Sequence, residues 1–260
     1  MPEEIRKYKD QLDGRVMLVR KAQVVPLEAI VRGYLVGAFS FFIFKSHSNF
    51  MFFVGSAWSE YKKSGTVHSI PMSVGLIDGQ KFAKPLFTPS TKAEQGAHDE
   101  NISPEQGRLI FLVHLLRLFL NQSFLAAKLI GQDLYDKISS AALKLYEEAA
   151  EYAQTRGVIL ADTKFEFGLV SNGLEKELIL IDELLTPDSS RYWPLKEYAP
   201  GKAQPSFDKQ YVRDWLVRAG FQKGLESGPA GKEGQGWFID EEVVKGTRER
   251  YAEALDLLTR

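Results

Sequence analysis

The clearest pattern of polar and apolar positions lies in the second half of the chain and predicts two strands. The first covers residues 158–167 and the second covers residues 178–184. Between them lie Ser171, Asn172 and Gly173, and Asn-Gly is the residue pair most typical of a tight hairpin turn. We therefore expect two antiparallel strands that are joined by this turn.

Apolar residues that recur at three- and four-residue steps predict a long helix over residues 126–155, which Gly157 would end. Upstream of it, Ser103 and Pro104 are typical of a helix start, with serine as the N-cap and proline at the first helical position. Further helices are expected over residues 3–13, 208–219 and 241–259.

The remaining apolar runs lie near the amino terminus. Residues 16–25 are strand-like and end at Pro26, and residues 29–36 form a second run that is rich in β-branched side chains. We interpret them as neighbouring antiparallel strands. Loops are expected over residues 70–101, 186–206 and 220–236. This order of elements indicates an α+β fold, in which an antiparallel sheet has flanking helices.

Composition excludes several classes of protein. The chain has 260 residues, enough for one large domain or two small ones. Its net charge is −1, so no basic excess indicates a nucleic-acid partner. It contains no cysteine, which excludes disulfides, thiolate metal sites and a cysteine nucleophile. Since the amino terminus is polar and no apolar run is long enough to span a membrane, we expect a cytoplasmic protein with no membrane partner.

Three charged residues, Asp162, Lys164 and Glu166, would share one face of the first predicted strand. Asp182 ends the apolar run of the second strand, so the hairpin would bring it near Glu166. Two carboxylates on neighbouring strands are typical of a Mg²⁺ site. The alternative is a surface charge ladder in which Lys164 pairs with Asp162 and Glu166. Spacing alone favours the ladder.

Two arginines are candidates for binding an anion. Arg191 follows a Pro-Asp-Ser-Ser turn and can hold a phosphate bidentately, although an exposed arginine beside an ordinary turn is equally compatible with the sequence. Arg32 lies inside an apolar run, where a charge needs a partner or a ligand. Residues 90–101 are dense in hydrogen-bonding groups, which suits a binding loop. No glycine-rich phosphate loop of the Walker or dinucleotide type is present.

Two segments differ sharply from their surroundings. Residues 38–54 hold seven of the chain's 17 phenylalanines, and residues 107–125 form an abrupt block of leucine and phenylalanine. Two buried elements are the favoured interpretation, and a membrane or partner surface is a weaker one. A third interpretation is that neither block is a native element.

Five strings in order carry a specific resemblance. They are PLEAIVRGYL (26–35), FTPSTKAEQGAHDENIS (87–103), ILADTKFEFG (159–168), LIDELLTPDSSRYW (180–193) and SFDKQYVRDWL (206–216). Together they resemble the SAICAR synthetase family in its fungal-type form, over most of residues 17–216.

The resemblance implies an ATP-dependent carbon–nitrogen ligase of purine biosynthesis, with a SAICAR synthetase-like fold related to ATP-grasp enzymes. In the family's reaction, ATP phosphorylates the carboxylate of carboxyaminoimidazole ribotide, and the amine of L-aspartate then displaces phosphate to form an amide. It also implies ATP and Mg²⁺ as cofactors and small-molecule substrates as partners. The oligomeric state is not indicated.

The motifs also imply the site residues. Those matching metal and nucleotide contacts are Glu166, Asp182, Val24 and Glu28. Those matching the ribotide-phosphate site and its turn are Arg32, Ser56, Asp188, Ser190 and Arg191. Those matching the loop beside ribotide and aspartate are Lys92, His98 and Asp99. The expected catalytic residues are Asp162, Lys164 and Lys209, and Arg213 would help Lys209 to close the site.

The chain departs from the family pattern at its start and at the two unusual blocks. A small nucleotide-binding lobe with a glycine-rich loop opens the family pattern, whereas this chain opens just before the hinge strand. We therefore expect residues 1–37 to be a remnant of that lobe, residues 38–55 to be an insert, and residues 56–260 to be the catalytic domain with a second insert at 107–125.

Removing both blocks restores the family strings GYLVGSAWSEY and NISPEQAAKLIGQDL. We hypothesise that both are translated introns and that the start site is misplaced, which sequencing of the transcript would check. Two other functions stay open on this basis. One is a truncated relative that binds ribotide but does not hold ATP, and the other is a metal-dependent phosphohydrolase that uses Glu166 and Asp182.

Overall fold

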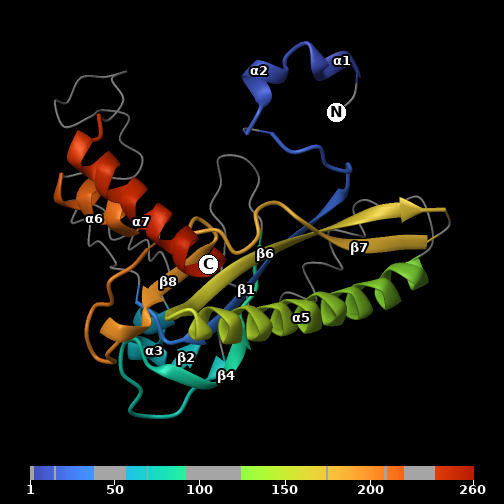
Figure 1. Ribbon diagram of the computed structural model, residues 1–260. Helices are drawn as coiled ribbons and strands as arrows, with labels where there is room; N and C mark the ends of the chain where they lie inside the picture. Colours follow the sequence, from blue (N-terminus) through green and yellow to red (C-terminus); the bar gives the residue numbers. More distant parts are fainter. Residues whose placement is uncertain are drawn as a thin grey trace, which may run out of the picture.

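A six-stranded antiparallel sheet organises the chain (Figure 1). The computed structural model describes residues 3–14, 16–37, 57–68, 70–91, 124–173, 175–207, 210–219 and 238–260. The strands of the sheet are β1 (Gln23–Tyr34), β4 (Lys81–Phe87), β5 (Ser90–Thr91), β6 (Val158–Asn172), β7 (Glu175–Ile181) and β8 (Ser190–Pro194). Their order is β4-β1-β6-β7, with β5 also pairing with β1 and β8 with β6. A separate pair consists of β2 (Thr66–Val67) and β3 (Ile70–Pro71).

Helix α5 (Phe124–Thr155) lies along one face of this sheet, where it packs against β6, β1 and β4 (Figure 1). Near the carboxyl end, α6 (Gln210–Arg218) packs against α7 (Glu241–Thr259). The shorter helices are α1 (Glu3–Arg6), α2 (Lys9–Leu12), α3 (Ala57–Ser64) and the 3-10 helix η1 (Leu195–Glu197). The arrangement confirms an α+β fold with an antiparallel sheet and flanking helices.

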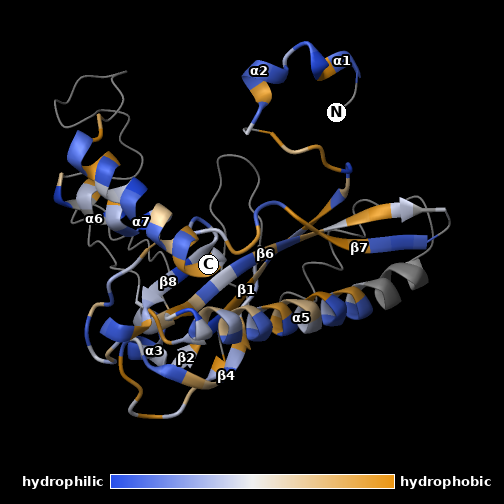
Figure 2. Cartoon of the chain, in the orientation of Figure 1, coloured by the Kyte–Doolittle hydropathy of each residue, from blue (hydrophilic) through white to orange (hydrophobic). Residues whose placement is uncertain are grey.

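Among the described residues, no helix is both long enough and apolar enough to cross a membrane. Figure 2 shows polar and apolar residues interspersed along α7. By contrast, an exposed apolar stretch, residues 16–19, connects α2 to β1 (Figure 2).

The predicted hairpin is confirmed. β6 pairs with β7 up to Asn172 and Glu175, and Gly173 has a φ of 67°, the left-handed conformation that a tight turn requires. β6 extends five residues beyond its predicted end at residue 167, because these residues pair with β7. β7 ends at Ile181 rather than at residue 184, since Asp182 has a φ of 62° and leaves the strand.

The prediction of two strands over residues 16–25 and 29–36 is wrong. β1 is one continuous strand that contains Pro26. Its register against β6 shifts between Val24 and Glu28, so Pro26 lies in an irregular stretch of the ladder between those residues. A strand tolerates proline at a bulge, where the missing N–H breaks no ladder bond.

Strands β4, β5 and β8 lie where loops were predicted. β5 has two residues and β8 has five, and Pro85 lies within β4, so none of them shows a long alternating pattern. The predicted helix over residues 3–13 is two short helices. The predicted long helix and the helix over residues 241–259 are confirmed, and α6 begins at Gln210 in the described part of the helix predicted from residue 208.

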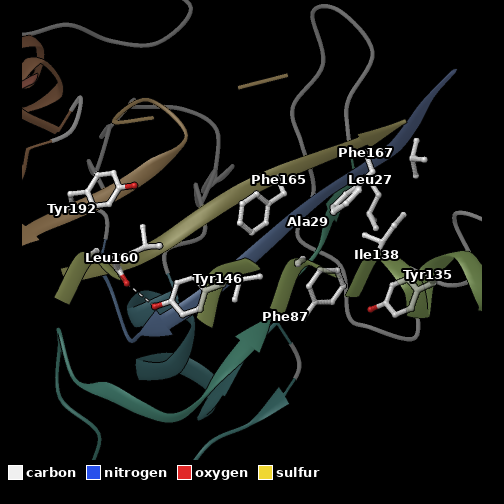
Figure 3. Packing of buried hydrophobic residues seen from close by; sticks show 14 of the residues in the cluster. Leu27, Ala29, Phe87, Tyr135, Ile138, Tyr146, Leu160, Phe165, Phe167 and Tyr192 are labelled. Atoms are coloured by element: carbon white, nitrogen blue, oxygen red, sulfur yellow. Dashed lines mark hydrogen bonds between the residues drawn. The ribbon is translucent and has the colours of Figure 1, made fainter. Parts of the chain in front are cut away.

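The main core lies between α5 and the sheet, and Figure 3 shows how its side chains meet. On β6, Val158 and Leu160 belong to the same cluster as Phe165 and Phe167. Because side chains of a regular strand alternate, even- and odd-numbered residues cannot share one face. The alternation therefore changes between these two pairs, at Ala161, where the register of β6 against β8 also shifts.

We expect Phe165→Ala to lower the free energy of unfolding by about 3–5 kcal/mol, because Phe165 is fully buried and its removal leaves a cavity. Urea unfolding followed by circular dichroism would measure the difference. Val74→Ala is the matched control, since that side chain is exposed and its truncation should leave the unfolding midpoint unchanged. Equal effects of the two substitutions would contradict this account of the core.

Candidate active site

Charged side chains from three neighbouring strands gather on the sheet face opposite α5. Asp162, Lys164 and Glu166 form a row on β6, and in the pairing Arg32 of β1 lies opposite Asp162 while Glu28 lies opposite Glu166. On the other side of β6, Arg191 of β8 also pairs with Asp162. The row therefore has partners from both adjoining strands.

One end of this row is a positive group formed by Arg32, Asp162 and Arg191. The Nη1 atoms of the two arginines lie 3.1 Å and 3.8 Å from the same carboxylate atom, Asp162 Oδ2. The three side chains are only 11%, 13% and 18% exposed in the order Arg32, Asp162, Arg191. These three side chains sum to a charge of about +1, and the negative charge of Glu60 also acts on Arg32. Two guanidinium groups held close together suit an anionic ligand.

Arg32 is further held by Thr88, whose hydroxyl oxygen accepts a hydrogen bond from Arg32 Nε at 3.1 Å. Burial lowers the pKa of Arg32, and the negative charge of Asp162 opposes that change. The guanidinium nevertheless remains protonated near neutral pH, because arginine is not deprotonated in proteins. Arg32 is therefore a fixed cation on this face.

The other end of the row is a negative group formed by Lys164, Glu28 and Glu166. Lys164 Nζ donates to Glu28 Oε1 and to Glu166 Oε1, both at 2.9 Å. The Glu166 side chain is 4% exposed and that of Glu28 is 12% exposed. The group has one cation and two anions, so its net charge is about −1.

Burial lowers the pKa of Lys164, but the hydrogen bonds to Glu166 and Glu28 outweigh that effect and raise it overall. The ammonium therefore stays protonated at neutral pH and does not act as a general base. It contributes charge instead. The predicted ladder is partly confirmed, since Lys164 pairs with Glu166, but its second partner is Glu28 rather than Asp162.

Two groups of opposite net charge thus lie along one strand, two residues apart. Consecutive residues of a strand rise by about 3.3 Å, which separates Asp162 from Lys164 by roughly 7 Å along the strand. A ligand with a phosphate at one end and a metal-binding group at the other matches this arrangement. The described residues contain no group of three or more His, Cys, Asp or Glu that could hold a metal, and Mg²⁺ commonly takes only one or two carboxylates.

Asp182 lies next to this acidic end. It directly follows Ile181, the residue that pairs with Glu166, and its side chain is exposed. Its φ of 62° is unusual for a residue other than glycine, and such conformations cluster at functional sites. The donor types fit a hard cation, so the metal-binding role of Glu166 and Asp182 stays a prediction that the local chain path supports.

Two predicted residues, Asp188 in the turn before β8 and Ser190 at the start of β8, do not join the charged face. Ser190 is 5% exposed, and its Oγ lies 2.8 Å from Thr163 Oγ1. Thr163 follows Asp162 in β6, so its side chain points to the opposite face of the sheet. Asp188 is exposed and accepts a hydrogen bond from the hydroxyl of Tyr251 at 2.8 Å. Their predicted contact with substrate therefore stays a prediction that these positions do not support.

Other predicted residues lie elsewhere. Val24 is 48% exposed and pairs with Gly168, beyond the acidic end of the face. Arg213 is exposed on α6. The predicted residues that lie outside the described ranges are Ser56, Lys92, His98, Asp99 and Lys209. The two unusual blocks also lie largely outside those ranges, so the division into a lobe remnant, inserts and a catalytic domain stays a prediction.

The sequence did not indicate two residues that support the site. Thr88 lies in one of the quoted strings, but only the fold shows that it holds Arg32. Tyr146 of α5 donates a hydrogen bond to the Leu160 carbonyl beside the charged row. Tyr146 lies within the helical apolar periodicity, so nothing in the sequence separates it from other core residues.

Lys164→Met should lower the free energy of unfolding by about 3 kcal/mol at pH 7, because it leaves two nearly buried carboxylates without their shared cation. The raised pKa of Lys164 means that its contribution is complete below the ordinary lysine value of about 10.4 and is lost only above it. Lys144→Met is the control, since Lys144 and Glu148 form an exposed pair worth under about 1 kcal/mol. A loss no larger than the control's would contradict the assignment.

Comparisons with known proteins identify the relatives of this chain. The family described as SAICAR synthetase matches residues 3–227. The phosphoribosylaminoimidazole-succinocarboxamide synthase of Pichia angusta is 47% identical over 261 aligned positions, which cover 100% of this chain and 70% of the relative. That of Maridesulfovibrio salexigens is 43% identical, covering 99% of this chain and 70% of the relative.

Among solved structures, the SAICAR synthase from Saccharomyces cerevisiae complexed with SAICAR matches with a TM-score of 0.70 and 39% identity. The match covers 100% of this chain and 69% of that one. On the evidence of the matched residues and these relatives, the chain belongs to the SAICAR synthetase family.

Proposed function

We propose that the charged face of β1, β6 and β8 binds the reactants of the SAICAR synthetase reaction. In that reaction ATP drives amide formation between the carboxylate of carboxyaminoimidazole ribotide and the amine of L-aspartate. The observation that carries the proposal is the pair of oppositely charged groups on one sheet face. A relative that is 39% identical was solved with SAICAR, a ligand that carries a ribose phosphate at one end.

The positive group takes the ribotide phosphate. Arg32 and Arg191 both direct a guanidinium nitrogen at Asp162, so the two cations are held close together before ligand arrives. Planar guanidinium groups bind phosphate oxygens through paired N–H donors. Because Asp162 is already shared by both arginines, its part is to hold them in place rather than to accept a proton from substrate.

The negative group lies at the nucleotide end. Glu166 and Asp182 are the residues that would hold Mg²⁺, which when bound screens the negative charge of the ATP phosphates. Lys164 limits the repulsion between Glu28 and Glu166 and keeps both carboxylates fixed. Glu166, one of the two proposed metal ligands, is thus held in place before a divalent cation binds.

The reaction does not require a covalent bond between the protein and a reactant. The ribotide carboxylate attacks the γ-phosphorus of ATP and forms an acyl phosphate with release of ADP, and the aspartate amine then forms the amide with release of phosphate. The residues of the face orient the reactants and oppose their charge, which is the main requirement of phosphoryl transfer. Their low exposure strengthens each interaction.

The reaction itself is the direct test. Purified protein would be given ATP, ribotide and aspartate, with each omitted in turn, while ADP and SAICAR are measured. Sustained release of ADP, and any formation of SAICAR, should require both ribotide and aspartate. Phosphate release without aspartate would favour a phosphohydrolase, and ribotide binding without any turnover would favour a relative that only binds ribotide.

We expect Arg191→Ala to raise the KM for ribotide by about 10- to 100-fold, because one of two phosphate-facing cations is lost. The KM for ATP should change by less than about twofold, since the arginine lies at the other end of the face. Steady-state kinetics would measure both constants. Arg6→Ala, which removes an exposed arginine of α1, is the control and should change neither. An unchanged KM for ribotide in Arg191→Ala would refute the assignment of the phosphate end.

Glu166→Gln should lower kcat/KM for ATP by about 100-fold or more, because the amide keeps the shape but removes the charge that attracts Mg²⁺. The Mg²⁺ concentration required for half-maximal rate should rise in the same variant. Glu177→Gln is the matched control, since Glu177 is half exposed and pairs only loosely with Arg20 at 3.7 Å. A variant at Glu166 with normal Mg²⁺ dependence would place the metal elsewhere.

A further inference from the structure

The charged row of β6 faces outward only because the strand is irregular at Ala161. In the pairing of β6 with β8, Leu160 lies opposite Tyr192 and Asp162 lies opposite Arg191. Two steps along β6 thus correspond to one step along β8, which leaves Ala161 as the extra residue of a β-bulge. The bulge is what allows Leu160 to face α5 while Asp162 faces the arginines.

Tyr146 of α5 forms a hydrogen bond at this bulge. Its hydroxyl donates to the carbonyl oxygen of Leu160 at 2.6 Å, and Figure 3 shows the bond reaching from the helix to the strand. That carbonyl belongs to the peptide that joins Leu160 to Ala161. Tyr146 is 3% exposed, so no solvent competes for the hydrogen bond. The hydroxyl therefore fixes the peptide at which the alternation changes.

Gly33 of β1 makes room for this hydroxyl. A Cβ at position 33 would lie 1.9 Å from Tyr146 Oη, far inside any tolerated contact. Gly33 directly follows Arg32, so the hydroxyl fills the space between β1 and β6 beside the positive group. Glycine at this position is thus explained by the approach of a side chain from another element.

The Tyr146 hydroxyl stays protonated at neutral pH. Burial raises the pKa of Tyr146, with Tyr34 and Asp162 adding to the effect, while a hydrogen bond with the Gly33 backbone acts in the opposite direction. A protonated hydroxyl is a constant donor to Leu160. The bond is therefore a permanent part of the framework.

We propose that Tyr146 is a positioning residue for the ribotide phosphate, which acts by fixing the Ala161 bulge and thereby the geometry of Arg32, Asp162 and Arg191. This inference rests on the proposed function, because it assumes that the positive group takes the ribotide. Asp162 lies two residues after Leu160, and its carboxylate is the atom group that both arginines share. A shift of the bulge would separate the two guanidinium groups.

The effect should be confined to one end of the site. Lys164 and Glu166 lie beyond Asp162 on a stretch of β6 that pairs regularly with β1 from Glu28 to Arg32. Regular pairing with β1, and the hydrogen bond that the Lys164 N–H donates to the Ser189 carbonyl oxygen at 3.0 Å, hold that stretch without the Tyr146 hydroxyl. Loss of the Tyr146 hydroxyl should therefore impair phosphate binding and leave nucleotide binding intact.

Tyr146→Phe is the first test, because it removes the hydroxyl and keeps the ring in the core. We expect the KM for ribotide to rise about tenfold, since displacement of a binding group by a fraction of an ångström has effects of this size or larger. The KM for ATP and kcat should stay within about twofold. Circular dichroism at the assay temperature would confirm that the variant is folded.

Tyr152→Phe is the matched control. Tyr152 belongs to the same helix and also donates its hydroxyl to a backbone carbonyl oxygen, at 2.8 Å. That carbonyl belongs to Leu258 of α7 and not to the bulge in β6. Its kinetic constants should equal those of the wild type. The proposal is overturned if Tyr146→Phe leaves the KM for ribotide within twofold, if it raises both KM values equally, or if the control shows the same change.

A second variant tests the link with Gly33. Gly33→Ala should raise the KM for ribotide more than Tyr146→Phe does, because the new methyl group displaces the hydroxyl. Adding Tyr146→Phe to Gly33→Ala should restore part of the loss, since the nearest remaining ring atom is 2.8 Å rather than 1.9 Å from the new Cβ. A double variant that is as impaired as the sum of the two single ones would contradict a shared position.

Binding separates this inference from the proposed function. If the wild type showed no aspartate-dependent turnover, the ligase proposal would fail, but titration calorimetry with ribose 5-phosphate would still report on the positive group. Weaker binding in Tyr146→Phe, together with wild-type binding in Tyr152→Phe, would support the positioning role. Equal binding in all three proteins would overturn it.

Discussion

The change of side-chain alternation at Ala161 is the constraint on which the charged face depends. β6 supplies Phe165 and Phe167 to the core and Asp162 to the site. Were the strand regular from Leu160 onward, every residue after Ala161 would move to the opposite face. Three charged side chains would then be buried against α5, where charges without partners are strongly destabilising. One extra residue in β6 therefore places the apolar side chains in the core and the charged side chains on the opposite face.

Pairing between strands supplies each charge with a counter-charge. Arg32 and Arg191 reach Asp162 from opposite sides, and Lys164 joins an acid of its own strand to Glu28 of the next. Ion pairs with so little exposure add little to stability over apolar residues of the same size. Stability alone thus does not account for them. Two clusters of ion pairs on one sheet face, one with two arginines and one with two glutamates, are better explained by the charged ligands that they would bind.

The sequence predicts those parts of the fold and site that depend on local patterns. The α5 periodicity, the β6–β7 hairpin and the shared face of Asp162 and Lys164 all follow from residue spacing. Partners distant in the chain do not follow from it, because no local pattern encodes the register that brings Glu28 to Lys164. The continuous β1 was missed since Pro26 usually ends a strand, and short β8 gives no periodic signal. Most individual residue roles came from family motifs rather than from spacing.

The same long-range pairing makes ligand binding and sheet formation interdependent. Arg32 and Asp162 are 130 positions apart, and Glu28 and Lys164 are 136 apart, so neither group exists until β1 lies beside β6. An anion held by Arg32 and Arg191 would connect β1 to β8 across β6, and it would favour the paired strands by mass action. Tyr146 then adds a contact that does not depend on ligand, since α5 holds the bulge from the opposite face. The helix thus keeps the positive group in its binding geometry while the site is empty, which lowers the ordering that a bound phosphate must impose.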